Sequence, residues 1–159
     1  MTSPGFSSME LQQIHTQSED EFTAEGVLIL KERLEQHIDE FGHAILGLSG
    51  GSTPKRIYTE LGKTDIDWAK VSIFLVDDRY VHPTDTESNQ QLIRDTLLLH
   101  AAIPEKQIFF PDTTTDLDSC VAEYEQDLAQ LLSRGIPHIV TLGLGGDGHI
   151  ASLFPPVPP

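Results

Sequence analysis

The residues best suited to chemistry in this sequence lie in one glycine-rich stretch, residues 143–149. An apolar run over residues 138–142 leads into this stretch, and Asp147 and His149 stand two residues apart within it. Glycines after a strand allow a sharp turn and let a ligand approach main-chain N–H groups. Because imidazole suits proton transfer near neutral pH, we expect an acid–base pair, or a carboxylate that orients an imidazole. The alternative is a loop in which backbone partners satisfy both side chains.

A second glycine-rich stretch, residues 49–56, has the composition of a phosphate-binding turn. It reads Ser-Gly-Gly-Ser-Thr-Pro-Lys-Arg and follows a short apolar run. Glycines before a helix expose N–H groups, and the helix dipole favours an anion at that end. Lys55 and Arg56 add positive charge nearby. The stretch is not a P-loop, because the pattern Gly-x-x-x-x-Gly-Lys-Ser/Thr is absent, and the alternative is a strand-to-helix turn with a Ser or Thr cap.

Charged residues follow the clearest predicted strand, residues 71–76. Asp77, Asp78 and Arg79 come next in the chain. An arginine can pair bidentately with a phosphate or a carboxylate, which makes Arg79 a candidate for binding such an anion. The alternative is an internal ion pair that closes the end of the strand, with Asn89 no more than a residue at the start of the next helix.

Three other kinds of site are disfavoured by the spacing of the residues. Neither Ser49 nor Ser152 lies in the Gly-x-Ser-x-Gly pattern of a serine nucleophile. The dinucleotide pattern Gly-x-Gly-x-x-Gly is nearly matched at residues 143–148, but it stands at the end of the chain, without room for the rest of a βαβ unit. No second His or Cys stands at ligand spacing from Asp147 and His149, so we expect no metal site.

The composition argues against nucleic acid and membranes as partners. The 159 residues include 25 acidic and 10 basic side chains, which give a formal net charge of −15 at pH 7 and oppose binding to nucleic acid or anionic lipid. The single cysteine, Cys120, cannot form an internal disulfide. No apolar run approaches the roughly 18–20 residues of a membrane span, and the first residues lack the pattern of a signal peptide. We therefore expect a cytoplasmic protein.

Hydrophobic periodicity predicts strands that alternate with helices. The spacing of apolar residues between Val27 and Phe41, after a capping-box pattern at Ser18, predicts the first helix. The expected helices span residues 18–41, 54–61, 88–99 and 116–132, and the expected strands span residues 9–16, 43–48, 71–76, 107–110 and 138–142. This alternation predicts a three-layer, doubly wound, mainly parallel sheet with helices on both faces. We expect residues 1–8 to be a flexible tail and residues 9–159 to form a single α/β domain.

The predicted sheet brings the candidate segments together. In such sheets, ligands bind beyond the carboxyl ends of the strands. Residues 49–54, 77–79 and 143–149 all follow predicted strands, so we expect them to meet at one edge of the sheet. Two other histidines, His37 on the first helix and His138 at the start of the last strand, are expected to be structural.

Four segments of this chain resemble a known family. Leu-Ser-Gly-Gly-Ser-Thr-Pro-Lys (48–55), Val-Asp-Asp-Arg-Tyr-Val (76–81), Ser88-Asn89 and Gly-Leu-Gly-Gly-Asp-Gly-His-Ile-Ala-Ser-Leu-Phe-Pro (143–155) are similar to motifs of the 6-phosphogluconolactonases. The resemblance implies a Rossmann-like fold of the phosphosugar isomerase/lactonase type. It also implies hydrolysis of 6-phospho-D-glucono-1,5-lactone to 6-phospho-D-gluconate, in the oxidative pentose phosphate pathway, without a cofactor.

The same resemblance assigns roles to residues. His149 would be the general base, Asp147 would orient it or the sugar hydroxyls, and Arg79 would bind substrate oxygens or phosphate. The positions expected to bind substrate or phosphate are Ser49, Gly50, Gly51, Ser52, Thr53, Lys55, Asp77, Asp78, Gly145 and Gly146.

The sequence leaves two alternatives open. The related glucosamine-6-phosphate deaminases carry a Glu where this chain has Phe154, and a phenyl ring cannot move protons, so deamination is disfavoured. Members of the family are also longer than this chain, so we expect it to lack the C-terminal third of the domain. A phosphosugar-binding domain without catalysis is therefore the second alternative.

Overall fold

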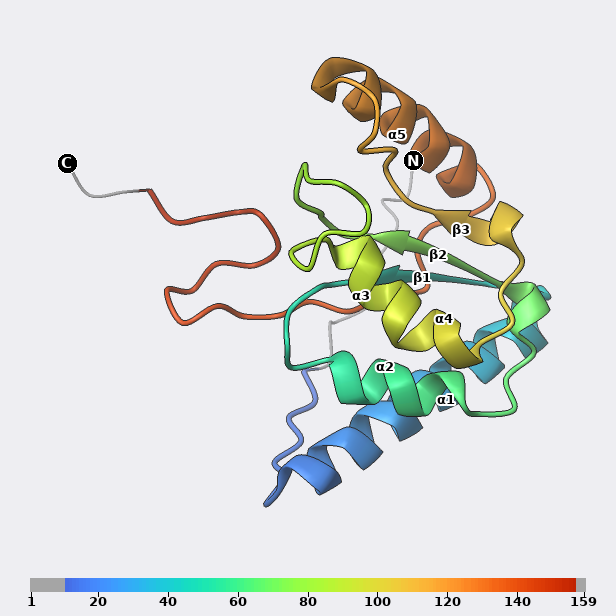
Figure 1. Ribbon diagram of the computed structural model, residues 1–159. Coiled ribbons are helices and arrows are strands. Elements are labelled where there is room, and N and C mark those ends of the chain that lie inside the picture. Colours follow the sequence, from blue (N-terminus) through green and yellow to red (C-terminus); the bar gives the residue numbers. More distant parts are fainter. Residues whose placement is uncertain (1–10, 157–159) are drawn as a thin grey trace, which may run out of the picture.

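The computed structural model describes residues 11–156, which form a parallel sheet flanked by helices (Figure 1). The helices are α1 (Glu19–Phe41), α2 (Lys55–Gly62), α3 (Asn89–Asp95), α4 (Leu97–His100) and α5 (Leu117–Leu132). The strands are β1 (Ala44–Leu48), β2 (Val71–Leu75), β3 (Ile108–Phe109) and β4 (Ile139–Val140). Their order in the sheet is β3-β2-β1-β4, and all neighbouring strands run parallel. The predicted α/β fold with a parallel sheet is confirmed.

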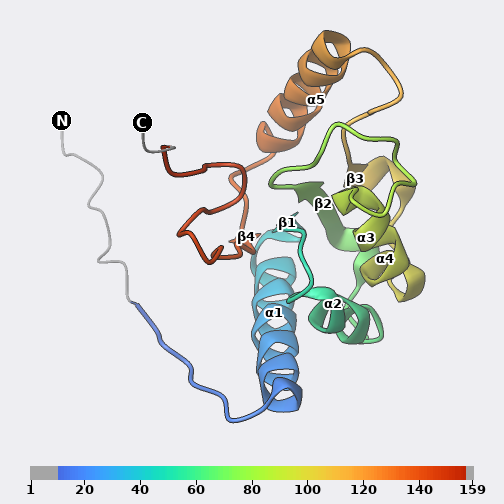
Figure 2. The ribbon, with the colours of Figure 1, turned by 60° about the vertical axis from the view of Figure 1, so that its left-hand side comes forward.

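The helices form two layers, one on each face of the sheet. Helices α1 to α4 cover one face and α5 lies across the other (Figures 1 and 2). Because parallel crossovers are right-handed, connections that progress from β1 through β2 to β3 put their helices on the same side. The connection from β3 to β4 runs back across the sheet, so its helix α5 lies on the opposite side. The three-layer, doubly wound arrangement follows from this reversal.

The main hydrophobic core lies between the sheet and helices α1 to α4. In the register of β1 with β2, Leu46 pairs with Ile73 and Leu48 with Leu75, and all four side chains are buried in this core. Burial of each such side chain stabilises the fold by about 1.5–3 kcal/mol. Close packing of α1 on α2 also explains a glycine inside α1. A Cβ on Gly26 would lie 2.6 Å from Ile57 Cδ1 of α2.

The predicted helix ends agree with the structure. Ser18 caps α1, and its hydroxyl accepts a hydrogen bond of 3.1 Å from the Glu21 N–H, as in a capping box. Pro54 directly precedes α2. The strands predicted at residues 43–48, 71–76, 107–110 and 138–142 all form, each trimmed by one or more residues.

Two predicted elements differ from the structure. The edge strand predicted over residues 9–16 is wrong for residues 11–16, which form no regular structure and leave Leu11 exposed; an alternating pattern makes a strand only where a sheet edge accepts it. Residues 9 and 10, like the predicted tail at residues 1–8, lie outside the described residues. The helix predicted over residues 88–99 is broken at Thr96, whose hydroxyl bonds back to the Leu92 carbonyl at 2.7 Å, a contact that bends helices.

The last helix, α5, forms as predicted, but its expected apolar face is only partly buried. Cys120 near the start of the helix and Leu131 near its end are buried, whereas Leu117 and Val121 are exposed. Contact with β3 and the end of β2 covers one side of the helix, and its first turns extend beyond the two-residue strand β3.

Candidate active site

The turn after β1 presents main-chain donors. Gly51 adopts a φ of +94°, a conformation that glycine reaches without strain. Within residues 11–156, the N–H groups of Gly50, Gly51, Ser52 and Thr53 donate to no protein acceptor. Helix α2 begins two residues after this run of donors, so its positive dipole end adds to them. The turn therefore presents four open donors next to the positive end of a helix.

Gly50 has a second, steric role in this turn. A Cβ at Gly50 would collide with the side-chain amide of Asn89. Asn89 begins α3 and donates through Nδ2 to the Asp77 carbonyl at 2.9 Å. The glycine thus lets the turn after β1 lie against the segment that follows β2.

The loop after β4 holds an imidazole and a carboxylate in direct contact. His149 Nδ1 lies 2.5 Å from Asp147 Oδ1, and the His149 N–H donates to the same oxygen at 3.1 Å. The bond from the imidazole is the main reason that the pKa of Asp147 lies below its usual value. Since an ionised carboxylate only accepts hydrogen bonds, this contact places a proton on Nδ1 and leaves Nε2 free to accept one.

Gly145 lies directly against the His149 and Asp147 side chains. A Cβ at Gly145 would collide with the His149 ring and would lie 2.9 Å from Asp147 Oδ1. Its N–H donates to the His149 carbonyl at 2.9 Å. The glycine is therefore required by the close approach of the ring. Gly146, the next residue, has nothing within 4 Å of such a Cβ.

The segment after β2 contributes one carboxylate to the cavity and uses the other for structure. Asp77 Oδ2 accepts a 2.6 Å bond from the Ser152 hydroxyl, which ties this segment to the loop after β4. Asp78 instead accepts from the N–H groups of Asn89 at 2.6 Å and Gln90 at 3.2 Å. Its carboxylate stabilises the start of α3, where the free N–H groups need acceptors.

Arg79 lies at the rim of the site with an exposed guanidinium. Nη1 donates to the Glu87 carbonyl at 3.0 Å and lies 3.7 Å from the Glu87 carboxylate. This contact fixes one nitrogen of the guanidinium, and the Arg79 side chain stays more than half exposed. The alternative of a buried ion pair with the neighbouring aspartates is not what the structure shows.

The turn after β1, the segment after β2 and the loop after β4 meet around one cavity of about 260 Å³ beyond the carboxyl ends of the strands. The sequence-predicted residues that line it are Ser49, Gly50, Gly51, Ser52, Thr53, Asp77, Arg79, Gly145 and His149. Asp147 does not line it but contacts the His149 ring. Lys55, Asp78 and Gly146 do not line it, and Arg56 is paired with Asp20 of α1 at 2.6 Å. The predicted convergence of the three segments is confirmed.

Other lining residues lie outside the predicted set. Pro54, Asn89, Gly143, Leu144 and Ala151 also border the cavity. Asn89 belongs to the Ser88-Asn89 motif, but a residue that begins a helix often has only a structural role. Its close approach to Gly50 in the structure is what indicates that it belongs to the site. Ala151 has a φ of +52°, unusual for a residue with a Cβ, and no sequence pattern signals that conformation.

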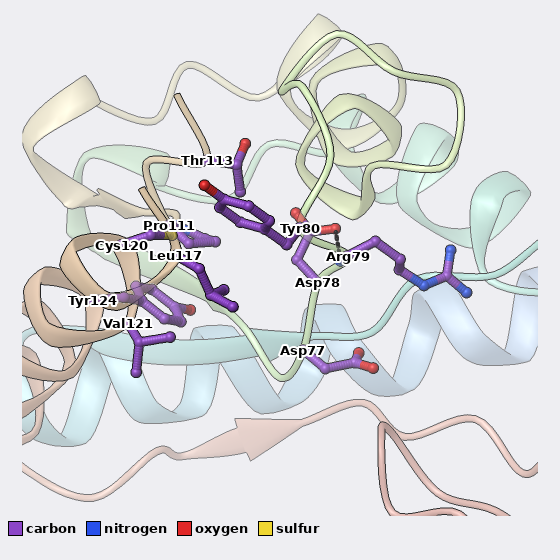
Figure 3. Close-up of a pocket in the computed structure, with 10 residues that line it drawn as sticks. All are labelled: Asp77, Asp78, Arg79, Tyr80, Pro111, Thr113, Leu117, Cys120, Val121 and Tyr124. Atoms are coloured by element: carbon purple, nitrogen blue, oxygen red, sulfur yellow. Dashed lines mark hydrogen bonds between the residues drawn. The ribbon is translucent and has the colours of Figure 1, made fainter. Parts of the chain in front are cut away.

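A second hollow of about 260 Å³ adjoins the first and differs from it in chemistry. Apolar and aromatic side chains of α5 and the segments after β2 and β3 line it, whereas the Arg79 guanidinium points away (Figure 3). Tyr124 donates to the Leu75 carbonyl at 2.8 Å and accepts from the Leu75 N–H at 3.1 Å. Burial raises the pKa of Tyr124 and also that of the Cys120 thiol, so neither group supplies a nucleophile at neutral pH.

Two further searches cover the described part of the chain. Among residues 11–156, no group of three or more His, Cys, Asp or Glu side chains is arranged to hold a metal ion. No helix within those residues combines the length and apolar character needed to cross a membrane.

Comparison with known proteins agrees with the geometry. The family described as glucosamine-6-phosphate isomerases/6-phosphogluconolactonase matches residues 17–158. A probable 6-phosphogluconolactonase of Dictyostelium discoideum is 40% identical over 153 residues, which cover 90% of this chain and 62% of that protein. A 6-phosphogluconolactonase of Xylella fastidiosa is 42% identical over 128 residues, 79% of this chain and 51% of that protein. The chain thus spans about half to three fifths of the length of these relatives.

Solved structures give the same result. The crystal structure of 6-phosphogluconolactonase from Thermotoga maritima superposes with a TM-score of 0.79 at 28% identity, over 84% of this chain and 61% of that one. The 6-phosphogluconolactonase of Trypanosoma cruzi superposes with a TM-score of 0.78 at 27% identity, over 93% of this chain and 64% of that one. Fold, motif order and sequence identity together show that this chain belongs to the glucosamine-6-phosphate isomerase/6-phosphogluconolactonase family.

Proposed function

We propose that this chain hydrolyses 6-phospho-D-glucono-1,5-lactone to 6-phospho-D-gluconate, in the oxidative pentose phosphate pathway. The observation that carries the proposal is one cavity bordered by both a run of open N–H groups, residues 50–53, and the imidazole of His149. An anion-binding turn and a base within one small cavity suit a substrate with a phosphate at one end and an electrophilic carbonyl at the other. The relatives named 6-phosphogluconolactonase support the same substrate.

The phosphate would bind at the turn after β1. Four unused N–H groups and the start of α2 attract an anion there, and the Ser52 and Thr53 hydroxyls add donors. Arg79, which also lines the cavity, keeps donors free for the phosphate or for sugar oxygens. The net charge of −15 repels an anionic substrate. Phosphate binding therefore depends on these local donors and not on the electrostatic field of the whole chain.

His149 would act as general base. With its Nδ1–H donated to Asp147, Nε2 takes a proton from a water molecule as the water oxygen attacks the lactone carbonyl. Main-chain N–H groups of the glycine-rich loops stabilise the resulting oxyanion. Collapse breaks the bond between the carbonyl carbon and the ring oxygen, and the imidazolium returns its proton to that oxygen. General-base assistance of this kind contributes about 10²–10⁴-fold in rate.

Phe154 favours hydrolysis over deamination of glucosamine 6-phosphate. Its ring lies 4.7 Å from the His149 ring, centre to centre. The deaminases place a proton-carrying Glu at this point of their motif, and a phenyl ring cannot replace it. The lactone is already cyclic and activated, so its hydrolysis needs no such group.

The test is a direct assay of the purified chain. We expect lactone hydrolysis above the spontaneous rate at about pH 7, where imidazole is largely neutral, and no ammonia from glucosamine 6-phosphate. Ammonia release would establish the deaminase alternative. Binding of 6-phosphogluconate with no increase in hydrolysis rate would favour the non-catalytic alternative.

The buried, free Cys120 is compatible with the cytoplasmic setting that we propose for the reaction.

A further inference from the structure

A buried polar network lies directly beneath the cavity and touches both glycine-rich loops. Its centre is Tyr58 of α2, which is completely buried. The Tyr58 hydroxyl donates to the Ser49 carbonyl at 2.9 Å and accepts from the Ser49 N–H at 3.2 Å. Burial raises the pKa of Tyr58, so the hydroxyl keeps its proton. Ser49 is thereby held at both of its main-chain groups immediately before the glycines of the turn.

Thr141 joins this network from the other loop. The Thr141 hydroxyl lies 2.9 Å from the Tyr58 hydroxyl. The Thr141 hydroxyl oxygen also accepts a 3.0 Å hydrogen bond from the Ser49 N–H. The Thr141 N–H donates to the Gly47 carbonyl at 2.9 Å, which continues the pairing of β4 with β1 beyond the last strand residue. Thr141 stands two residues before Gly143, where the loop that carries His149 begins.

The network therefore connects the turn after β1, helix α2 and the segment that leads into the His149 loop. Ser49 leads into the turn of open N–H groups, Tyr58 belongs to the helix whose start adds to that turn, and Thr141 leads into the His149 loop. The short strand β4 pairs with β1 through only two residues, Ile139 and Val140, so it fixes the loop beyond it weakly. The hydroxyl contacts supply the missing restraint, because a buried hydroxyl that loses its partner is costly.

We propose that Tyr58 and Thr141 are positioning residues that fix the His149 imidazole relative to the anion-binding turn. The proposal rests on the proposed function, since positioning matters to catalysis only if the phosphate and the reacting carbonyl occupy that cavity together. A displacement of the base by about 1 Å is enough to cost about 10²-fold in rate.

The test uses a matched pair of variants at one position. Thr141→Val keeps the shape and removes the hydroxyl, and we expect it to lower kcat for lactone hydrolysis at least about tenfold, with a smaller change in KM. Thr141→Ser keeps the hydroxyl and should stay within about threefold of the wild type. Thr96→Val is the control, because the Thr96 hydroxyl is likewise bonded to a main-chain carbonyl but lies between α3 and α4, away from the cavity. Wild-type kcat and KM in Thr141→Val would overturn the proposal.

A second readout separates this proposal from the proposed function. Hydrogen exchange of the Gly145 amide, which donates to the His149 carbonyl, reports the order of the His149 loop without any turnover. We expect faster exchange in Thr141→Val and in Tyr58→Phe, and wild-type exchange in Thr141→Ser and Thr96→Val. If the wild type hydrolyses no lactone, the proposed function fails, and this measurement still decides the positioning role. Unchanged Gly145 exchange in both Thr141→Val and Tyr58→Phe would overturn the role whatever the assay shows.

Discussion

Two histidines, one before β4 and one after it, differ in the hydrogen-bond partner of their Nδ1 atom. His138 precedes the strand, and its Nδ1 accepts a 3.0 Å bond from the Ile45 N–H. Its ring stacks on His37 and Phe41, with centres 4.6 and 5.4 Å away. His149 follows the strand, and its Nδ1 faces a carboxylate instead.

The partner of Nδ1 explains the difference between the two rings. A backbone N–H uses the lone pair of Nδ1 and requires it to be unprotonated, so His138 serves as a fixed acceptor. A carboxylate places the proton on Nδ1 and leaves Nε2 as the basic atom of His149, whose side chain borders the cavity. One hydrogen bond thus decides whether the side chain is a fixed acceptor, as in His138, or has the tautomer that we propose for the base, as in His149.

The largest expected effect is the loss of the reactive imidazole. His149→Ala should lower the rate of lactone hydrolysis by about 10²–10⁴-fold and leave the melting temperature close to that of the wild type, since the side chain is partly exposed. Steady-state kinetics and thermal unfolding measure both. His100→Ala, at an exposed position on α4, is the control. A full rate in His149→Ala would reject this residue as the base.

Displacement of the ring without its removal should come next. Gly145→Ala puts a methyl group where the His149 ring lies, and we expect about a 10²-fold loss of kcat from the misplaced base. Gly146→Ala is the matched control, because a Cβ there meets nothing within 4 Å. Equal activity of the two variants would contradict the close packing of the ring on Gly145.

Removal of the carboxylate should have an intermediate effect. Asp147→Asn replaces an acceptor-only carboxylate with a neutral amide that can also donate and so no longer fixes the proton on Nδ1, and we expect at least about a tenfold loss of kcat, part of the general-base contribution. Because the pKa of Asp147 is lowered in the folded state, its contribution to stability is present above its unfolded pKa of about 4 and is lost as the pH falls below it. The variant should therefore unfold with a weaker pH dependence in acid. Wild-type kcat would show that the carboxylate does not act through the imidazole.

The smallest effect concerns His138 and appears in stability alone. Burial, together with His37 and His43, lowers the pKa of His138. The unfolded chain then binds more protons than the folded one just below pH 6.5, so the free energy of unfolding should decrease as the pH falls through that range. His138→Asn keeps an acceptor near Nδ1 but does not titrate, and denaturant titrations at several pH values should show a flatter dependence. An unchanged slope would mean that His138 does not cause it.

The sequence predicts most of the fold because its signals are local. The capping pattern at Ser18, the apolar spacing of α1 and the β-branched run of β2 are decided by neighbours in the chain. The exposed stretch at residues 11–16 escapes prediction because it depends on whether a distant sheet edge accepts a strand, and the break at Thr96 escapes it because the apolar spacing does not show that the Thr96 hydroxyl bonds to the Leu92 carbonyl. Residues of the site follow the same division. The glycines and His149 are visible in the sequence, whereas the role of Asp78 in capping α3 and the contact of Asn89 with Gly50 exist only in three dimensions.

The shortness of β4 has a thermal consequence. The strand joins the sheet through two residue pairs, whereas β1 and β2 share five, so the segment that bears His149 detaches at a lower free-energy cost than the central pair of strands. On heating, catalysis should therefore fade at temperatures where the helical circular-dichroism signal is still intact. Recovery of the rate on cooling would be rapid and complete, because only the outermost strand would have to dock again.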